Sequence, residues 1–152
     1  MAVTKTARNK VRIWIVIPII IGLVIFGASI VFLADAPVRQ ELQMLVIGDV
    51  DFTKLKDGTY TGEYNGLKGD SRNAAVEITV LNGEITGIKI LKGALDSDGN
   101  LAEFTDGRTI GDLFQRVVES ETLQVDAISG ATLTSKAHLK ALENALRQAQ
   151  KQ

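Results

Sequence analysis

The chain has 152 residues, among them 17 basic and 18 acidic side chains, one histidine and no cysteine. This length suits one compact domain with some chain left over for an anchor. The absence of cysteine excludes disulfides, thiolate metal sites, thioether-linked haem and cysteine nucleophiles. The single histidine, His138, excludes most zinc sites and any catalytic set that needs two histidines.

The charges are unevenly distributed along the chain. The part from Asp35 onward holds all 18 acidic residues and 13 basic ones, a net charge of −5. A net-acidic portion argues against nucleic-acid binding, because neutralising phosphates requires a basic face. The other four basic residues precede a long apolar run: Lys5, Arg8, Lys10 and Arg12.

That apolar run, residues 13–34, contains no charge over 22 residues. As a helix it would be about 33 Å long, which matches a hydrocarbon core of about 30 Å, so we expect one transmembrane helix. The positive-inside bias predicts a cytoplasmic N-terminus, residues 1–12, and an extracytoplasmic position for everything from residue 35, in the cell membrane. A cleaved signal peptide is the alternative, but the run is long for one and Pro37 fits the cleavage site poorly.

Residues 35–56 are expected to form an extracytoplasmic connector. Pro37 is compatible with the start of a short helix that continues through Val46. Three interpretations stay open at this point: the connector packs on a partner, lies near the lipid surface, or is a plain spacer.

Strand and turn signals follow from residue 57. Asp57-Gly58 predicts a turn before a strand at 59–64, and residues 74–81 alternate between apolar and polar side chains as in a half-buried strand. Asn82-Gly83 is a strong two-residue hairpin signal and predicts a return strand over 85–91.

The remaining elements alternate between loops and helices. A loop at 93–107 precedes a helix at 110–118 that Thr109 can cap, then a short strand at 123–125, then a last helix capped by Thr134 or Ser135. We therefore expect residues 57–152 to form an α+β domain, a small antiparallel sheet with packed helices. Asp96, Asp98 and Asp106 lack the spacing of a calcium loop and are interpreted as solvated, and no metal site is expected.

The segment from Asp126 to Ser135 is the one that can carry chemistry. Gly130 permits a turn with positive φ, and Thr132 then offers a hydroxyl just before a helix N-terminus, where an anion such as a phosphate is favoured. From composition alone, a turn and a helix cap is the commoner outcome for such a segment.

This segment resembles the flavinylation motif Asp-x-x-Ser/Thr-Gly-Ala-Thr of the FMN-binding domain family. The family includes FMN-carrying peripheral subunits of the Rnf complex and of the sodium-translocating NADH:quinone reductase. The matching positions here are Asp126, Ser129, Gly130, Ala131 and Thr132, with Thr134-Ser135 following. The resemblance extends over about residues 55–149. The chain departs from the larger subunits at 92–98, which lacks their Glu-Thr-Pro-Gly stretch, so no contacts to the isoalloxazine ring are transferred.

The resemblance implies covalent FMN, joined by a phosphoester to Thr132, with Thr134 as the rival acceptor. A flavin transferase would attach it outside the membrane with FAD as donor. Asp126 would serve transferase recognition or loop shape, and Ser129 and Thr134 would bond the phosphate or shape the bend. The site residues so implied are Asp126, Ser129, Gly130, Ala131, Thr132, Thr134 and Ser135.

We accordingly expect an electron carrier rather than a stand-alone enzyme, and no catalytic residue is assigned. Expected partners are the lipid bilayer, membrane redox-complex subunits or a quinone-linked donor, and the transferase. A flavin-dependent reductase acting on a small substrate and a structural subunit without flavin are the alternatives. His138 is a weak acid–base candidate, because a histidine one turn into a helix is more often a partly exposed surface residue.

Overall fold

The computed structural model describes residues 17–23, 39–67, 72–104 and 106–151. The chain divides into two compact units, Met1–Pro37 and Val38–Gln152. In the first unit, residues 17–23 are helical. Among the described residues, no helix is both long enough and apolar enough to span a bilayer. Apart from 17–23, the span expected at 13–34 lies outside the described residues.

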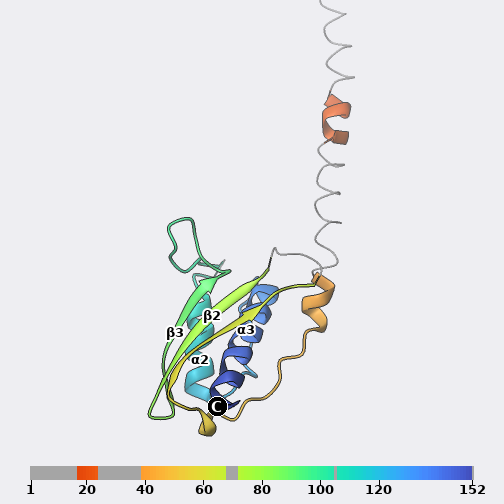
Figure 1. The fold of residues 1–152 in the computed structure, drawn as a ribbon. Helices are drawn as coiled ribbons and strands as arrows, with labels where there is room; N and C mark the ends of the chain where they lie inside the picture. The colour runs from red at the N-terminus through yellow and green to blue at the C-terminus, as the bar shows by residue number, and fades with distance from the viewer. Residues whose placement is uncertain (1–16, 24–38, 68–71, 105, 152) are drawn as a thin grey trace, which may run out of the picture. The chain divides into compact units, whose positions relative to one another are not determined.

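The second unit is built on a three-stranded antiparallel sheet (Figure 1). Its strands follow one another in space as in sequence: β1 (Gly58–Tyr64), β2 (Ala74–Leu81) and β3 (Glu84–Lys92). Ile78 in the centre pairs with Tyr60 on one side and with Ile88 on the other. The strands expected at 59–64, 74–81 and 85–91 are confirmed.

The β2–β3 hairpin turns at Asn82 and Gly83, whose φ angles are 56° and 80°. Two consecutive positive φ values are typical of a type I′ turn, whose twist matches the strands that it joins. The register then shifts, because Val80 pairs with Ile85 while the preceding residue of β2, Thr79, pairs with Gly87. This bulge explains why apolar residues of β3 do not alternate regularly.

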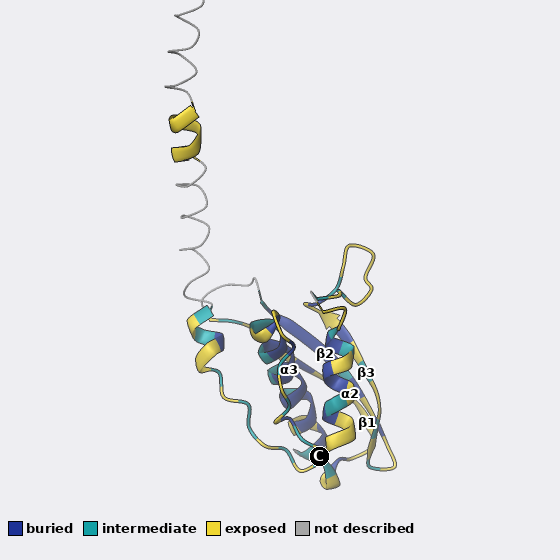
Figure 2. Cartoon of the chain, turned by 180° about the vertical axis from the view of Figure 1, so that it is seen from behind, coloured by how far each residue is buried: buried dark blue, intermediate teal, exposed yellow. Residues whose placement is uncertain are grey.

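Two helices cover one face of the sheet, α2 (Ile110–Ser120) and α3 (Thr132–Lys151) (Figure 2). Helix α2 begins at Ile110 with Thr109 as its N-cap residue, as expected. The carboxylate of Asp112 accepts from the backbone N–H and the hydroxyl of Thr109 at 2.6 and 2.9 Å. The apolar faces of sheet and helices form one core, which includes Val76, Ile78, Val80, Leu113, Val117, Leu142 and Leu146.

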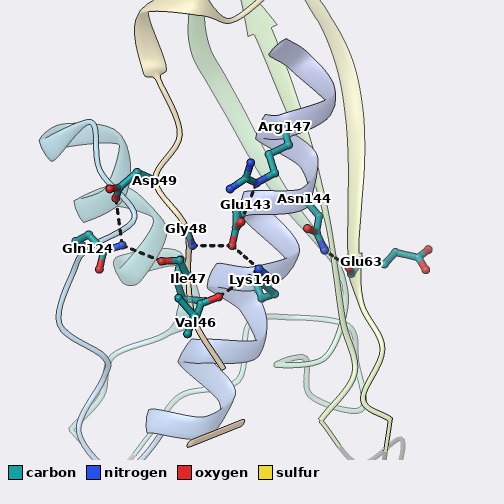
Figure 3. Close-up of polar contacts among 10 residues, drawn as sticks. All are labelled: Val46, Ile47, Gly48, Asp49, Glu63, Gln124, Lys140, Glu143, Asn144 and Arg147. Atoms are coloured by element: carbon teal, nitrogen blue, oxygen red, sulfur yellow. Dashed lines mark hydrogen bonds and ion pairs between the residues drawn. The ribbon is translucent and has the colours of Figure 1, made fainter. Parts of the chain in front are cut away.

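The long helix α3 packs closely against β1. Gly62 makes this possible, because a Cβ there would overlap the backbone of Ala141 and Ala145. Farther along, the side-chain amide of Asn144 donates to the Glu63 carbonyl at 2.8 Å (Figure 3). The amide of Gln148 donates to the Thr61 carbonyl at the same distance. Helix side chains thus satisfy carbonyls of an edge strand.

The connector runs along α3 of the same chain. It is helical at 39–44, extended afterwards, and ends in a short 3-10 helix, η1 (Phe52–Lys54). Leu42 is fully buried. Gly48 donates its N–H to Glu143 at 3.0 Å, and Lys140 donates to the Val46 carbonyl at 3.2 Å (Figure 3). The interpretation as a plain spacer is therefore wrong.

The prediction of a short strand at 123–125 is also wrong. Leu123 is buried, but the segment is irregular and pairs with no strand among the described residues. Residues 123–125 instead contact the connector, through the side chain of Gln124. The Gln124 amide donates to the Ile47 carbonyl at 3.1 Å and to Asp49 at 3.3 Å (Figure 3).

Candidate functional site

A tight turn precedes α3. The Ala131 N–H donates to the Ile128 carbonyl at 3.0 Å, and Gly130, the third residue of the turn, has a φ of 76°. This positive φ is what a type II turn requires at its third position, and glycine adopts it without steric cost. The Ala131 carbonyl then accepts from the Ser135 N–H at 2.8 Å, so that the helix begins at Thr132.

This start corrects the expectation that Thr134 or Ser135 caps the helix. Both residues lie inside its first turn. The Ser135 hydroxyl instead points back and accepts the N–H of Ile128 at 3.1 Å, and it is fully buried. Ser135 therefore fixes the bend from within, because it satisfies a backbone donor that the turn would otherwise leave unpaired.

The segment presents its hydroxyls unequally. Thr132, the first residue of α3, is exposed, whereas Thr134 is half-buried. Ala131 is buried beneath the turn. Three other residues of the segment are exposed: Asp126, Ser129 and Gly130. Thr132 and Ser129 are thus the hydroxyls that a second protein reaches most readily.

His138 lies beneath the same helix end and is only 1% exposed. Its Nε2 accepts from the Ala94 N–H at 3.2 Å, so the ring hydrogen is on Nδ1, which donates to the Thr134 carbonyl at 2.8 Å. Burial lowers the pKa of His138, outweighing the backbone hydrogen bonds that raise it. The expectation of a partly exposed histidine is wrong, because the helix turns this position toward the loop after β3.

Gly93 lets that loop approach the histidine. Its φ is 115°, and a Cβ there would lie 2.6 Å from two atoms of the imidazole ring. His138 therefore joins the Gly93–Ala94 backbone to the first turn of α3, and its role in this structure is architectural.

Comparison with known families identifies the domain. A model described as the FMN-binding domain matches residues 66–147, which is more than half of the chain. The chain belongs to the FMN-binding domain family. The match runs from before β2 into α3 and includes the whole segment from Asp126 to Ser135. None of the curated proteins compared with the chain matches it.

Membership in this FMN-binding domain family supports FMN as the cofactor, and the start of α3 suits the phosphate of FMN. The first turn of this 20-residue helix contains no acidic residue. The residue before it, Ala131, has no side-chain oxygen to cap the free N–H groups. These N–H groups and the helix dipole favour an anion, typically by about 0.3–1 kcal/mol.

Two aspartates of the 93–107 loop form hydrogen bonds or an ion pair with nearby residues of the FMN-binding domain. Asp96 accepts the N–H groups of Asp98 and Asn100, each at 2.9 Å. Asp106 forms an ion pair with Arg108. Within the described ranges, no cluster of three acidic or histidine side chains is arranged to hold a metal ion.

An apolar groove of about 440 Å³ lies elsewhere on the FMN-binding domain, between β3 and α2. Its walls include Ile85, Ile88, Ile90, Phe114 and Val118, and no residue of the 126–135 segment lines it. Sequence reasoning missed this groove, since it depends on how far α2 covers the third strand.

Proposed function

We propose that this protein is a membrane-anchored, extracytoplasmic electron carrier whose FMN is joined by a phosphoester to Thr132. The proposal rests on the position of the Thr132 hydroxyl in the structure. Thr132 is exposed at the first position of α3, within a chain of the FMN-binding domain family. A phosphate attached there would lie at the positive end of the helix dipole.

The proposed attachment is a phosphoryl-group transfer from FAD. The Thr132 oxygen attacks the FMN phosphorus, a new O–P bond forms, and the bond to the AMP phosphate breaks. AMP leaves, the hydroxyl proton is lost, and no electron is gained or lost. A separate flavin transferase supplies the catalytic groups, while the 128–131 turn presents the acceptor.

Thr132 is preferred over Thr134 because the two hydroxyls differ in access. Thr134 is half-buried, and its Oγ lies 3.5 Å from Nη1 of Arg72. The exposed Thr132 hydroxyl is therefore the more accessible acceptor of the two.

The bound flavin would supply one-electron and two-electron chemistry, and the protein would supply its position and electrostatic surroundings. A covalent link suits an extracytoplasmic carrier, since free FMN would be lost by diffusion there. The proposed donor is a membrane redox-complex subunit or a quinone-linked protein, and the proposed acceptor lies outside the cytoplasm.

Coexpression with a flavin transferase tests this function. We expect the intact mass to increase by FMN minus one water in the wild type and in Thr134→Ala. We expect no increase and no in-gel flavin fluorescence in Thr132→Ala. Flavin that persists in Thr132→Ala would show that the attachment residue is wrong. A wild type without flavin would instead favour a structural subunit.

The groove between β3 and α2 gives the second candidate function, a reductase acting on a small substrate, some support. A measurement of turnover distinguishes the electron carrier from the reductase. A carrier should exchange electrons with a partner but show no sustained reduction of small substrates by itself. Rapid multiple turnovers by the purified flavinylated protein without a partner would favour the reductase.

A further inference from the structure

The start of the connector lies beside the start of α3 (Figure 1). The Nζ of Lys136, in the second turn of α3, donates to the Gln43 carbonyl at 2.7 Å. Near the other end of the helix, the N–H of Lys56 donates to the Ala149 carbonyl at 3.2 Å. The connector therefore enters the domain at the same end of α3 as Thr132.

The connector and the loop after β1 expose large apolar side chains at this end of the domain. Leu67, Val46 and Met44 are 92, 76 and 72% exposed, the highest values for large apolar side chains among the described residues of the second unit. Single exposed apolar side chains are common on protein surfaces, whereas several in one place mark a contact site.

A hydrogen bond and the chain itself keep these three side chains near one another. The N–H of Leu67 donates to the Glu41 carboxylate at 2.9 and 3.1 Å. Glu41 and Met44 lie three residues apart in the helix at 39–44, so they share one of its faces. Val46 follows Met44 by two residues. We call Met44, Val46 and Leu67 the connector patch.

The connector patch is also close in sequence to the apolar run at 13–34. Five peptide links join Ala34 to Arg39, and even a fully extended chain of that length spans no more than about 18 Å. If the apolar run spans a bilayer, the connector must begin near the surface of that bilayer. A lipid surface is therefore the apolar environment that the connector patch reaches first.

We propose that the connector patch inserts its side chains into the interfacial region of the membrane that holds the apolar run. This inference rests on the membrane anchor of the proposed function. Surface-bound elements bury their apolar side chains about 5–10 Å deep, at the boundary of headgroups and acyl chains. The contact would hold the start of α3, and a flavin on Thr132, close to the bilayer and to a donor in it.

Fluorescent labels on single cysteines test this contact, because the chain has no cysteine of its own. The full-length chain, made without the flavin transferase, is reconstituted in phosphatidylcholine vesicles containing a lipid with a nitroxide at the top of its acyl chain. A label on Leu67→Cys should lose most of its fluorescence to this nitroxide lipid.

Leu81→Cys is the matched control. Leu81 is an exposed apolar residue next to the β2–β3 hairpin, and the Gly83 N–H of that hairpin donates at 2.9 Å to Asp57, which follows Lys56. The control position thus lies toward the other end of α3, and a label there should keep its fluorescence.

A second set of variants tests the rest of the connector patch. Met44→Gln combined with Val46→Gln should restore most of the fluorescence of the label at position 67. Both side chains are exposed, so the fold should tolerate the change. Leu81→Gln should not restore the fluorescence.

Equal quenching at positions 67 and 81, whether strong or absent, would overturn the lipid contact. Quenching at 67 that the two glutamines leave unchanged would overturn the role of Met44 and Val46. Alkaline carbonate extraction separates this inference from the anchor. A chain that leaves the membrane overturns both, whereas an anchored chain whose label at 67 is not quenched overturns only the lipid contact.

Discussion

Small and hydroxyl-bearing residues surround the start of α3 for different physical reasons. Gly130 accommodates a positive φ in the turn, and Ala131 leaves the helix end without a side-chain cap. Ser135 holds the bend from the inside, while Thr132 presents its hydroxyl to solvent. One short segment therefore combines a hydrogen-bonded turn, a helix start preceded by alanine and an exposed hydroxyl.

His138 should make the stability of the domain depend on pH near neutrality. Its pKa in the folded protein is lowered by burial, so the unfolded chain binds the proton first as the pH falls. Stability should therefore decrease below about pH 6.5, by at most about 1.4 kcal/mol per pH unit. Urea unfolding between pH 7.5 and 5.5 measures this loss.

His138→Gln is the control for that measurement, because the chain has no other histidine. The variant should be less stable at pH 7.5 but should lack the decrease between pH 7 and 5.5. Equal pH dependence in the wild type and the variant would contradict the role of this buried imidazole.

At the scale of elements, the sequence predicted correctly those elements that depend on their own residues. Asn82-Gly83 predicted the hairpin, and Thr109 predicted the start of α2. Elements that depend on distant partners could not be predicted in this way. Leu123 has the character of a strand residue but pairs with no strand in the part of the chain that the structure describes. His138 is buried by a loop 44 residues earlier.

The close packing of β1 on α3 predicts a severe effect of Gly62→Ala. The added methyl group would overlap helix backbone, which cannot move aside as a flexible side chain can. We expect a loss of about 3 kcal/mol of unfolding free energy, or failure to fold. Gly87→Ala is the matched control on β3, where a Cβ meets nothing within 4 Å, and it should change stability by less than about 1 kcal/mol. Similar losses in the two variants would contradict this packing.

The carboxylate of Glu143 links the connector to α3 through hydrogen bonds. This side chain is 2% exposed and accepts from Gly48 N–H, Lys140 and Arg147 at 3.0, 2.8 and 2.8 Å (Figure 3). Burial raises the pKa of Glu143, but the two cations and the N–H outweigh it, so the net shift is downward. The carboxylate therefore stabilises the fold above its unfolded pKa of about 4.5, and this contribution is lost as the pH falls through the folded value.

Glu143→Gln should lower the unfolding free energy by about 2 kcal/mol at pH 7, because two cations lose their partner. The difference from the wild type should shrink as the pH drops from 5 to 3. Chemical denaturation at several pH values checks this, with exposed Glu103→Gln as control. A difference that stays constant over this range would argue against an ionised Glu143 in the folded protein.

At the scale of the whole molecule, the proposal requires that the chain be held at a membrane by residues 13–34. The four basic residues before this run and the net-acidic part after it predict one orientation. Full-length protein should stay in the membrane pellet during alkaline carbonate extraction. Protease added outside intact spheroplasts should digest the FMN-binding domain. Recovery of the intact, uncleaved chain in the carbonate supernatant would contradict the anchor.

The most direct test of the central claim is to locate the flavin on the chain. Trypsin should release residues 117–136 as one peptide, which contains Ser129, Thr132, Thr134 and Ser135 together. Fragmentation of this peptide from protein matured with a flavin transferase should assign the FMN mass to Thr132. An FMN adduct on any other residue, or an unmodified peptide in flavin-transferase-matured protein, would contradict the account.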